Sequence, residues 1–129
     1  MNRYRLLVIT MICFSLISGC VPGTTYVVSN NKPAKNLPMA EIYYDLGKAS
    51  YNQGDFYKST EYLFKAVENF ESRRKIAYAY IFIGANFFYR EEISYTKKYF
   101  KKARMFSPSI YPQRKDFPYE IINLFNTTK

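Results

Sequence analysis

Residues 43–66 read YYDLGKASYNQGDFYKSTEYLFKA and residues 80–103 read YIFIGANFFYREEISYTKKYFKKA, and these two stretches decide the fold. Each has an aromatic residue, an aliphatic residue followed by glycine, a break, and then apolar residues at helical spacing that end in alanine. Gly47 and Gly84 are 37 residues apart. Because small residues let two helices approach closely, the pattern predicts two helix-turn-helix units whose helices touch at these positions.

The two stretches resemble the tetratricopeptide repeat (TPR), a helix-turn-helix unit of about 34 residues with an aromatic, a Leu-Gly pair and small residues between its helices. Ala66 and Ala103 match the small residues and are again 37 residues apart. About three residues are therefore extra, and they fall between Ala66 and Tyr80. The resemblance implies an all-α fold. The alternative is a pair of unrelated amphipathic hairpins that share helical spacing.

The two predicted turns differ. In the first unit Gly54 stands where a left-handed residue ends a helix, and Asp55 follows as a residue that can cap the next helix. The second unit has Arg90-Glu91-Glu92 at the same place. We expect this second turn to be less stable by about 1 kcal/mol, unless it takes another conformation.

Residues 117–125 read FPYEIINLF and predict a further amphipathic helix. Pro118 suits its first turn. Its apolar stripe consists of Phe117, Ile121, Leu124 and Phe125. The predicted domain, residues 40–129, is thus two TPR-like repeats and a C-terminal capping helix. Since about three repeats are needed for stable stacking, either the cap docks well or the molecule depends on a partner.

The first twenty residues have the features of a bacterial lipoprotein signal. Residues 1–19 contain a basic start, an apolar run from 6 to 17 and small residues before Cys20. Residues 16–20, LISGC, resemble the lipobox, which implies that residues 1–19 are removed and that Cys20 carries the lipid. The alternative is a plain secretory signal cut elsewhere. A helix of twelve residues rises about 18 Å, too little for a permanent transmembrane segment.

Residues 20–39, rich in Pro, Asn, Ser and Thr, predict a flexible lipidated tether. The alternative is that residues 24–29 fold back as a short strand. Removing residues 1–19 takes away two arginines, so 17 Lys and Arg face 10 Asp and Glu and the mature charge is +7. Val21 after the cysteine implies, by resemblance to enterobacterial sorting, the outer membrane facing the periplasm as the location in the cell envelope.

We expect neither an enzyme nor a metal protein. The chain has no histidine, and its carboxylates are scattered along amphipathic helices. Glu41 and Asp45 share a helix face but have no His or Cys beside them to complete a metal site. The expected cofactor is none, apart from the covalent lipid at Cys20.

The positions that face the concave side in TPR proteins fall on aromatic and polar residues in this chain. The resemblance implies a partner-binding groove that could hold an extended or helical peptide. Its residues are Tyr44, Lys48, Tyr51, Asn52, Tyr78, Phe82, Phe88 and Tyr89. The alternative is that much of this face is core, covered by the C-terminal helix. The charged clamp of chaperone-binding TPR proteins is not reproduced, because Ala85 stands where an amide is needed.

A second candidate surface is basic. It consists of Lys97, Lys98, Lys101, Lys102 and Arg104, all in one predicted helix. Lys97, Lys101 and Arg104 fall at i, i+4 and i+7 and share a face. Such a charge run is commonly a solvated face, and near an anionic membrane it would help to orient the domain.

These features predict a lipid-anchored envelope protein that binds another protein, as a scaffold or assembly factor. A pilotin-like helper and an accessory subunit of an envelope machine are the candidate roles. The alternative is a structural envelope lipoprotein that binds peptidoglycan or lipopolysaccharide through the basic helix. We expect a protein partner and the membrane, but no nucleic acid, and a homo-oligomer stays open. The fold does not select among these roles.

Overall fold

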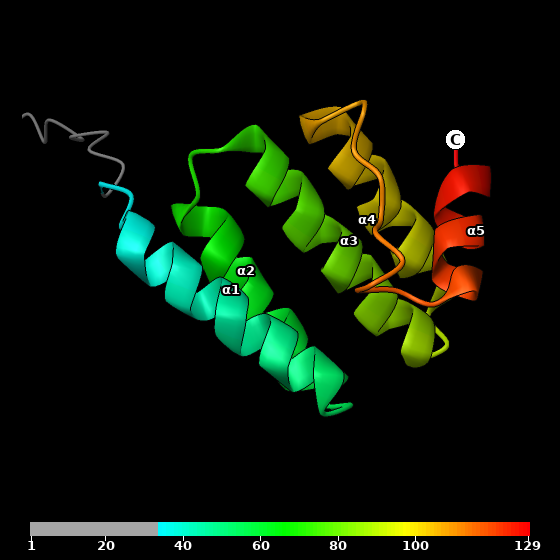
Figure 1. The fold of residues 1–129 in the computed structure, drawn as a ribbon, viewed down its shortest axis with the longest axis horizontal. Coiled ribbons are helices and arrows are strands. Elements are labelled where there is room, and N and C mark those ends of the chain that lie inside the picture. The colour runs from blue at the N-terminus through cyan, green and yellow to red at the C-terminus, as the bar shows by residue number, and fades with distance from the viewer. Residues whose placement is uncertain (1–33) are drawn as a thin grey trace, which may run out of the picture. The chain divides into compact units, whose positions relative to one another are not determined.

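The computed structural model describes residues 34–129, which form five α-helices and no strand (Figure 1). They are α1 (Leu37–Asn52), α2 (Phe56–Asn69), α3 (Arg73–Tyr89), α4 (Ile93–Phe106) and α5 (Tyr119–Thr127). The all-α prediction is confirmed. The predicted signal, Cys20 and the tether up to residue 33 lie outside the described residues. Helix α1 begins three residues before residue 40, where we expected the helical domain to begin.

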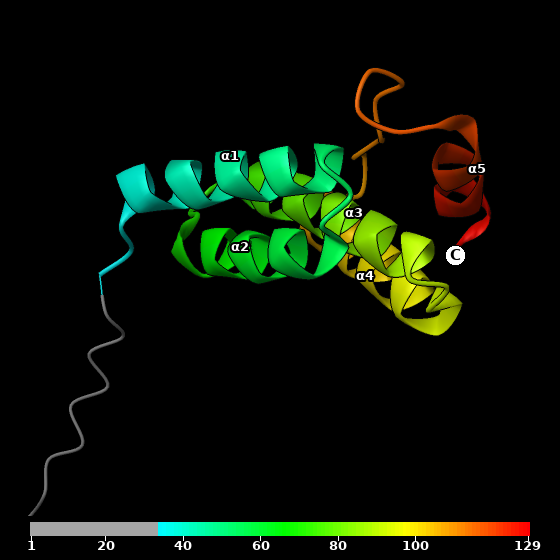
Figure 2. The same ribbon diagram turned by 90° about the horizontal axis from the view of Figure 1, so that it is seen from below.

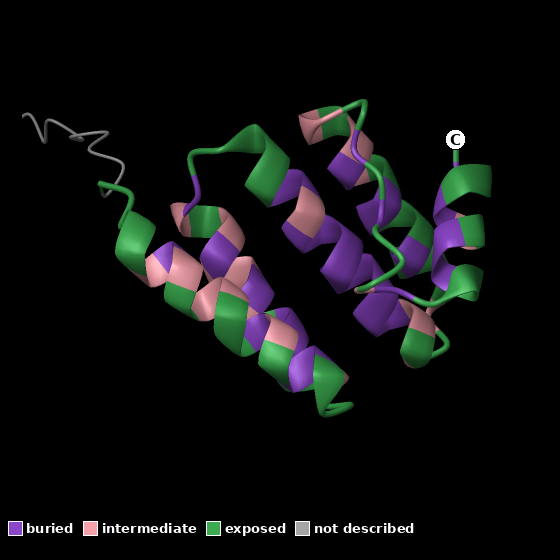
Figure 3. Ribbon diagram, in the orientation of Figure 1, coloured by how far each residue is buried: buried purple, intermediate pink, exposed green. Residues whose placement is uncertain are grey.

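The first four helices form two hairpins. Helix α1 packs on α2 and α3 packs on α4, and α2 joins the hairpins by packing on α3 (Figures 1 and 2). Helix α3 is the central element, and every residue from 79 to 87 along it is buried (Figure 3). None of the described helices is long and apolar enough to cross a bilayer.

Both hairpins make the same turn. Gly54 has φ +79°, and its amide donates to the Tyr51 carbonyl at 3.0 Å. Glu91, 37 residues later, has φ +62°, and its amide donates to the Phe88 carbonyl at 3.0 Å. The second turn therefore adopts the same left-handed conformation as the first although it has no glycine. The strain expected there is not avoided by a different backbone conformation.

The residues after these turns behave differently. Asp55 Oδ1 accepts the Lys58 amide at 3.1 Å and caps α2. Glu92 makes no side-chain cap to α4, and instead its carboxylate pairs with Arg90 at 2.6 Å. The capping role predicted for Asp55 is confirmed.

The two repeat glycines lie where paired helices touch. A Cβ atom at Gly47 would lie 2.7 Å from Leu63 Cγ, and one at Gly84 would lie 2.5 Å from Phe100 Cε1. Leu63 and Phe100 are themselves 37 residues apart. The predicted reason for small residues at these positions is confirmed, because no side chain fits between the helices of either hairpin.

The C-terminal helix forms two residues later than its sequence pattern suggested. Pro118 is the N-cap residue of α5, and Phe117 precedes the helix. Phe125 of α5 is buried and meets the ring of Phe100 on α4 edge-on at 5.1 Å. Residues 107–118, which we call the strap, run outside the hairpins to reach α5 (Figure 2).

Candidate functional site

The predicted groove is present in part. A cavity of about 690 Å³ opens between α1, the N-terminal half of α3 and the strap. Tyr44 and Lys48 of α1 and Tyr78 of α3 line it, so three of the eight predicted groove residues share one cavity. The strap forms the opposite wall, to which Asp116 contributes. We call this cavity the groove.

A hydrogen-bond network ties the strap to the helices at the bottom of the groove. The Tyr78 hydroxyl donates to Asp116 Oδ2 at 2.7 Å and accepts the Gln113 amide at 3.2 Å. Lys48 Nζ lies 3.9 Å from Asp116 Oδ1. Burial raises the pKa of the Tyr78 phenol, and the hydrogen bond to Asp116 raises it further. Tyr78 therefore stays protonated and holds the strap in place.

The rim of the groove carries more positive than negative charge. Its two carboxylates already have partners, since Glu41 pairs with Lys75 and Asp116 with Lys48. Arg74 and Lys115 also line the groove, are exposed and make no ion pair among residues 34–129. The surplus cations favour an occupant with negative charge.

Tyr51 and Phe82 belong to the core and do not line an open groove. Their exposed fractions are 8% and 1%. The ring of Phe117 lies 4.5 Å from that of Phe82 and 6.0 Å from that of Tyr51, so it covers them both. The alternative that part of the concave face is core is thus correct for these two residues. The cover is Phe117 of the strap, however, and not α5 itself.

The remaining predicted groove residues lie at the C-terminal ends of α1 and α3. Asn52 is exposed and Phe88 is half-buried. Tyr89 is 42% exposed and stacks on the ring of Phe56 at 4.6 Å. None of these three lines the groove. The structure therefore divides the predicted concave face into three parts: the groove, a middle part covered by Phe117, and the partly exposed C-terminal ends of α1 and α3.

Sequence reasoning did not find the strap residues of the groove. Asp116 and Gln113 contact Tyr78, from which they are separated by 38 and 35 residues. No local period connects residues so far apart in a segment without helical pattern. The only signal was the Pro-rich run at 110–115, whose composition predicts no more than a short link between two helices.

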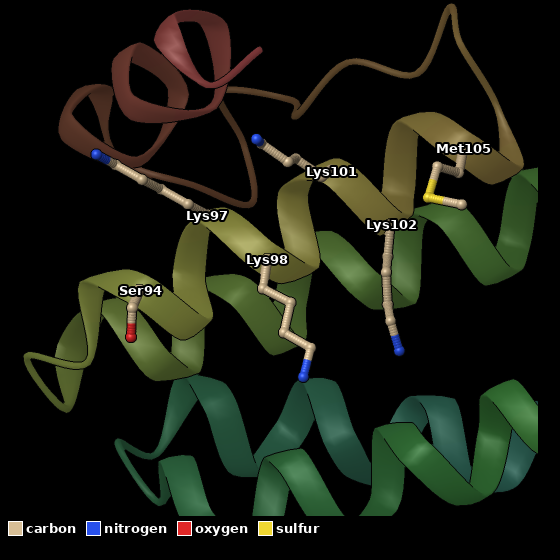
Figure 4. A pocket seen from close by; sticks show the side chains of 6 residues that line it. All are labelled: Ser94, Lys97, Lys98, Lys101, Lys102 and Met105. Atoms are coloured by element: carbon tan, nitrogen blue, oxygen red, sulfur yellow. The ribbon is translucent and has the colours of Figure 1, made fainter.

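The basic helix presents a second surface. Lys97, Lys98, Lys101 and Lys102 line a shallow cavity of about 420 Å³ on the solvent side of α4 (Figure 4). Ser94 and Met105 complete its lining, and we call these six residues the lysine face.

Arg104 is not part of the lysine face. Its guanidinium donates to the carbonyl oxygens of Thr128 and, at 2.7 Å, of Phe125. It thereby binds the C-terminal end of α5, whose carbonyl groups need donors. Lys97, Lys101 and Arg104 fall on one side of α4 as their spacing predicts, but the Arg104 guanidinium is engaged with α5 while the four lysines line the shallow cavity.

Within residues 34–129, no group of three Cys, Asp or Glu side chains is arranged to hold a metal ion. Compared with protein-family models, with curated proteins and with solved structures, the chain matches none of them.

Proposed function

We propose that this chain is a lipid-anchored protein of the bacterial envelope, on the outer membrane, whose helical domain binds another protein. Its role is that of a scaffold or assembly factor, either pilotin-like or as an accessory subunit of an envelope complex. It has no enzymatic activity of its own. The observation that carries this proposal is the groove, an open cavity between two helices and the strap.

The groove has the properties of a peptide-binding site. Its volume of about 690 Å³ suits a few side chains of a partner rather than a whole domain. Tyr44 and Tyr78 supply rigid rings, which contribute contact area at small entropic cost. Lys48 Nζ lies 5.7 Å from the ring centres of Tyr44 and Phe82, and Arg74 and Lys115 add charge at the rim. We infer a partner segment with an acidic residue beside an apolar one.

The expected lipid at Cys20 and the resemblance to TPR proteins support the same role. An anchored repeat domain keeps its partner close to the membrane, where envelope machines assemble. Labelling of cells with an alkyne fatty acid tests the anchor, and incorporation into a Cys20→Ser variant would contradict it.

Site-specific photo-crosslinking in the producing cell tests the groove. Tyr111, which lines the groove and is 52% exposed, is replaced by a photoreactive phenylalanine derivative in the full chain. Tyr119, which is 69% exposed and does not line the groove, receives the same substitution as a control. We expect a discrete protein adduct from position 111 and none from position 119. Equal adducts from both positions, or none from either, would contradict the proposal.

A charge change at the rim sharpens this test. Lys115→Glu should reduce the adduct at position 111 about tenfold or more, because it places a negative charge where an acidic segment binds. Arg114→Glu changes the neighbouring exposed residue, which does not line the groove, and serves as the matched control. If both variants lower the adduct equally, only net charge matters and the groove is not the binding site.

The lysine face favours a second candidate, a structural envelope lipoprotein that binds peptidoglycan or lipopolysaccharide. Purified peptidoglycan or lipopolysaccharide that binds residues 34–129 through the lysines, together with no protein adduct at position 111, would select this candidate over the first.

A further inference from the structure

The lysine face places four positive charges around the solvent side of α4. With about 100° between successive residues of a helix, its six residues fall within an arc of about 140°. That arc lies opposite the buried residues Thr96 and Ala103. Among residues 34–129, no carboxylate lies within ion-pair distance, 4.0 Å, of any of the four ammonium groups.

Among themselves, the charges of the lysine face oppose folding. Lys97 and Lys101, like Lys98 and Lys102, are like charges at i and i+4, which repel each other on a helix. Figure 4 shows the first pair pointing to one side of α4 and the second pair to the other. The ammonium groups of Lys98 and Lys102 lie between 5.3 and 5.9 Å from the rings of Tyr80, Tyr95 and Tyr99, contacts that attract a cation but neutralise no charge. The positive charges of the four unpaired ammonium groups would be neutralised by an anionic surface outside the chain.

We propose that the lysine face docks the domain laterally on an anionic phospholipid surface. Lysines are point charges on flexible stems, so they suit a plane of mobile phosphate groups, whereas bidentate recognition of one carboxylate or phosphate favours arginine. The single arginine of α4, Arg104, is engaged with α5 instead. Met105 lies in the middle of the arc with 73% of its surface exposed, and its apolar stem can enter the headgroup region.

This binding is independent of the groove. The groove is lined by α1, α3, the strap and residues just before α3, and it shares no residue with the lysine face. Both surfaces can therefore be occupied at once. A lipid at Cys20 would keep the domain near such a surface, but binding through the lysines does not require it.

Vesicle binding of residues 34–129 tests the proposal. The hydrophobic core of the described residues lies between 40 and 125, so we expect residues 34–129 to fold as a unit, and circular dichroism checks their helices. Binding is measured by flotation with vesicles of one part phosphatidylglycerol to two parts phosphatidylcholine, and with vesicles of phosphatidylcholine alone. We expect binding to the mixed vesicles only, and weaker binding as the salt concentration rises.

Two variants of equal charge separate the lysine face from net charge. The first changes all four lysines of the face to Gln, and the second changes four exposed cations outside α4, namely Lys58, Arg74, Arg114 and Lys115. Near an anionic membrane each lysine strengthens binding about fivefold, so the first variant should lose at least 100-fold. The second should lose fivefold at most.

Several results would overturn the proposal. These are equal binding to both kinds of vesicle, no binding to either, or equal losses in the two variants. Lysine-dependent binding to soluble polyglutamate without binding to vesicles would assign the face to an acidic protein instead. If the fourfold variant does not fold, Lys97→Gln with Lys101→Gln gives the same test, with an expected loss of about 25-fold.

Discussion

Glu91 adopts a strained backbone conformation in the turn of the second hairpin. It has φ +62°, a left-handed conformation that crowds the Cβ atom of any residue except glycine. Gly54 takes the same conformation in the first hairpin, and a Cβ atom there would meet nothing within 4 Å. At Gly54 the glycine is therefore required by the backbone conformation and not by lack of space. The strain at Glu91 is retained because the hydrogen bonds of the turn and the packing of α3 on α4 over-determine it.

We therefore predict that Glu91→Gly stabilises the domain by about 0.5–1 kcal/mol, after the greater entropy of glycine in the unfolded chain is subtracted. Gly54→Ala should destabilise it by about 1 kcal/mol for the converse reason. Chemical denaturation of residues 34–129 measures both changes. A loss of stability in Glu91→Gly would show that the side chain contributes more than its backbone strain costs.

At the scale of elements, helix pairs meet at glycines and helix ends are bound by cations from elsewhere. Lys35 Nζ donates to the Phe70 carbonyl after α2 at 2.6 Å, and the Arg73 guanidinium donates to the Met105 and Phe106 carbonyls of α4 at 3.0 Å. Arg104 does the same for α5. Each helix end that lacks internal partners thus receives donors from another part of the chain. Lys35, Arg73 and Arg104 therefore stabilise the fold, and their positive charges are explained by this role.

The close approach of α3 and α4 gives a prediction at this scale. Gly84→Ala should destabilise the domain by about 2 kcal/mol, because its Cβ atom would lie 2.5 Å from the Phe100 ring. Phe100→Leu, the residue of the first hairpin at this position, should make room and recover part of the loss. Thermal unfolding of the single and double variants measures the coupling. Strictly additive losses would mean that the two side chains do not meet.

At the scale of the whole molecule, buried aromatic rings join the hairpins, the strap and α5. Tyr51 packs against four rings, those of Phe56, Phe82, Tyr89 and Phe117. Its hydroxyl is buried and has no hydrogen-bond partner among residues 34–129, although Tyr89 lies close enough to influence its ionisation. Burial raises the pKa of Tyr51, and also those of Tyr44 and Tyr78. Core stability is thereby linked to tyrosine ionisation.

This linkage predicts unfolding at high pH. In the unfolded chain these phenols ionise at the ordinary pKa of about 10, whereas in the folded chain they keep their protons to higher pH. Above about pH 10 the unfolded state therefore binds fewer protons, and stability falls as the pH rises; below pH 10 this contribution is fully present. Tyrosinate absorbance and circular dichroism, recorded together, should show buried tyrosines ionising in the same step as helix loss. Ionisation of every tyrosine near pH 10 with unchanged helicity would contradict this.

The burial of Tyr51 decides which variants can test partner binding. Tyr51→Ala would remove a buried ring and unfold part of the domain, so it cannot test partner binding. Exposed rim residues such as Lys115 can be changed without this loss.

The sequence by itself determined the helices, the two hairpins and their 37-residue relation. These follow from local features: apolar residues at helical spacing, the cap at Asp55 and glycines where a Cβ atom has no room. The resemblance to TPR proteins, and not a period in the sequence, placed Tyr44, Lys48 and Tyr78 on one face, and the structure brings these three into one cavity. Only the tertiary structure decided what covers the face on which they lie. The strap has no periodic pattern, and its partners are more than thirty residues away. The strap runs over α3, where Phe117 covers Tyr51 and Phe82 and Asp116 lines the groove, and this course depends on where α5 docks. That docking depends in turn on Arg104 and on the contact between Phe125 and Phe100, which local sequence rules do not describe.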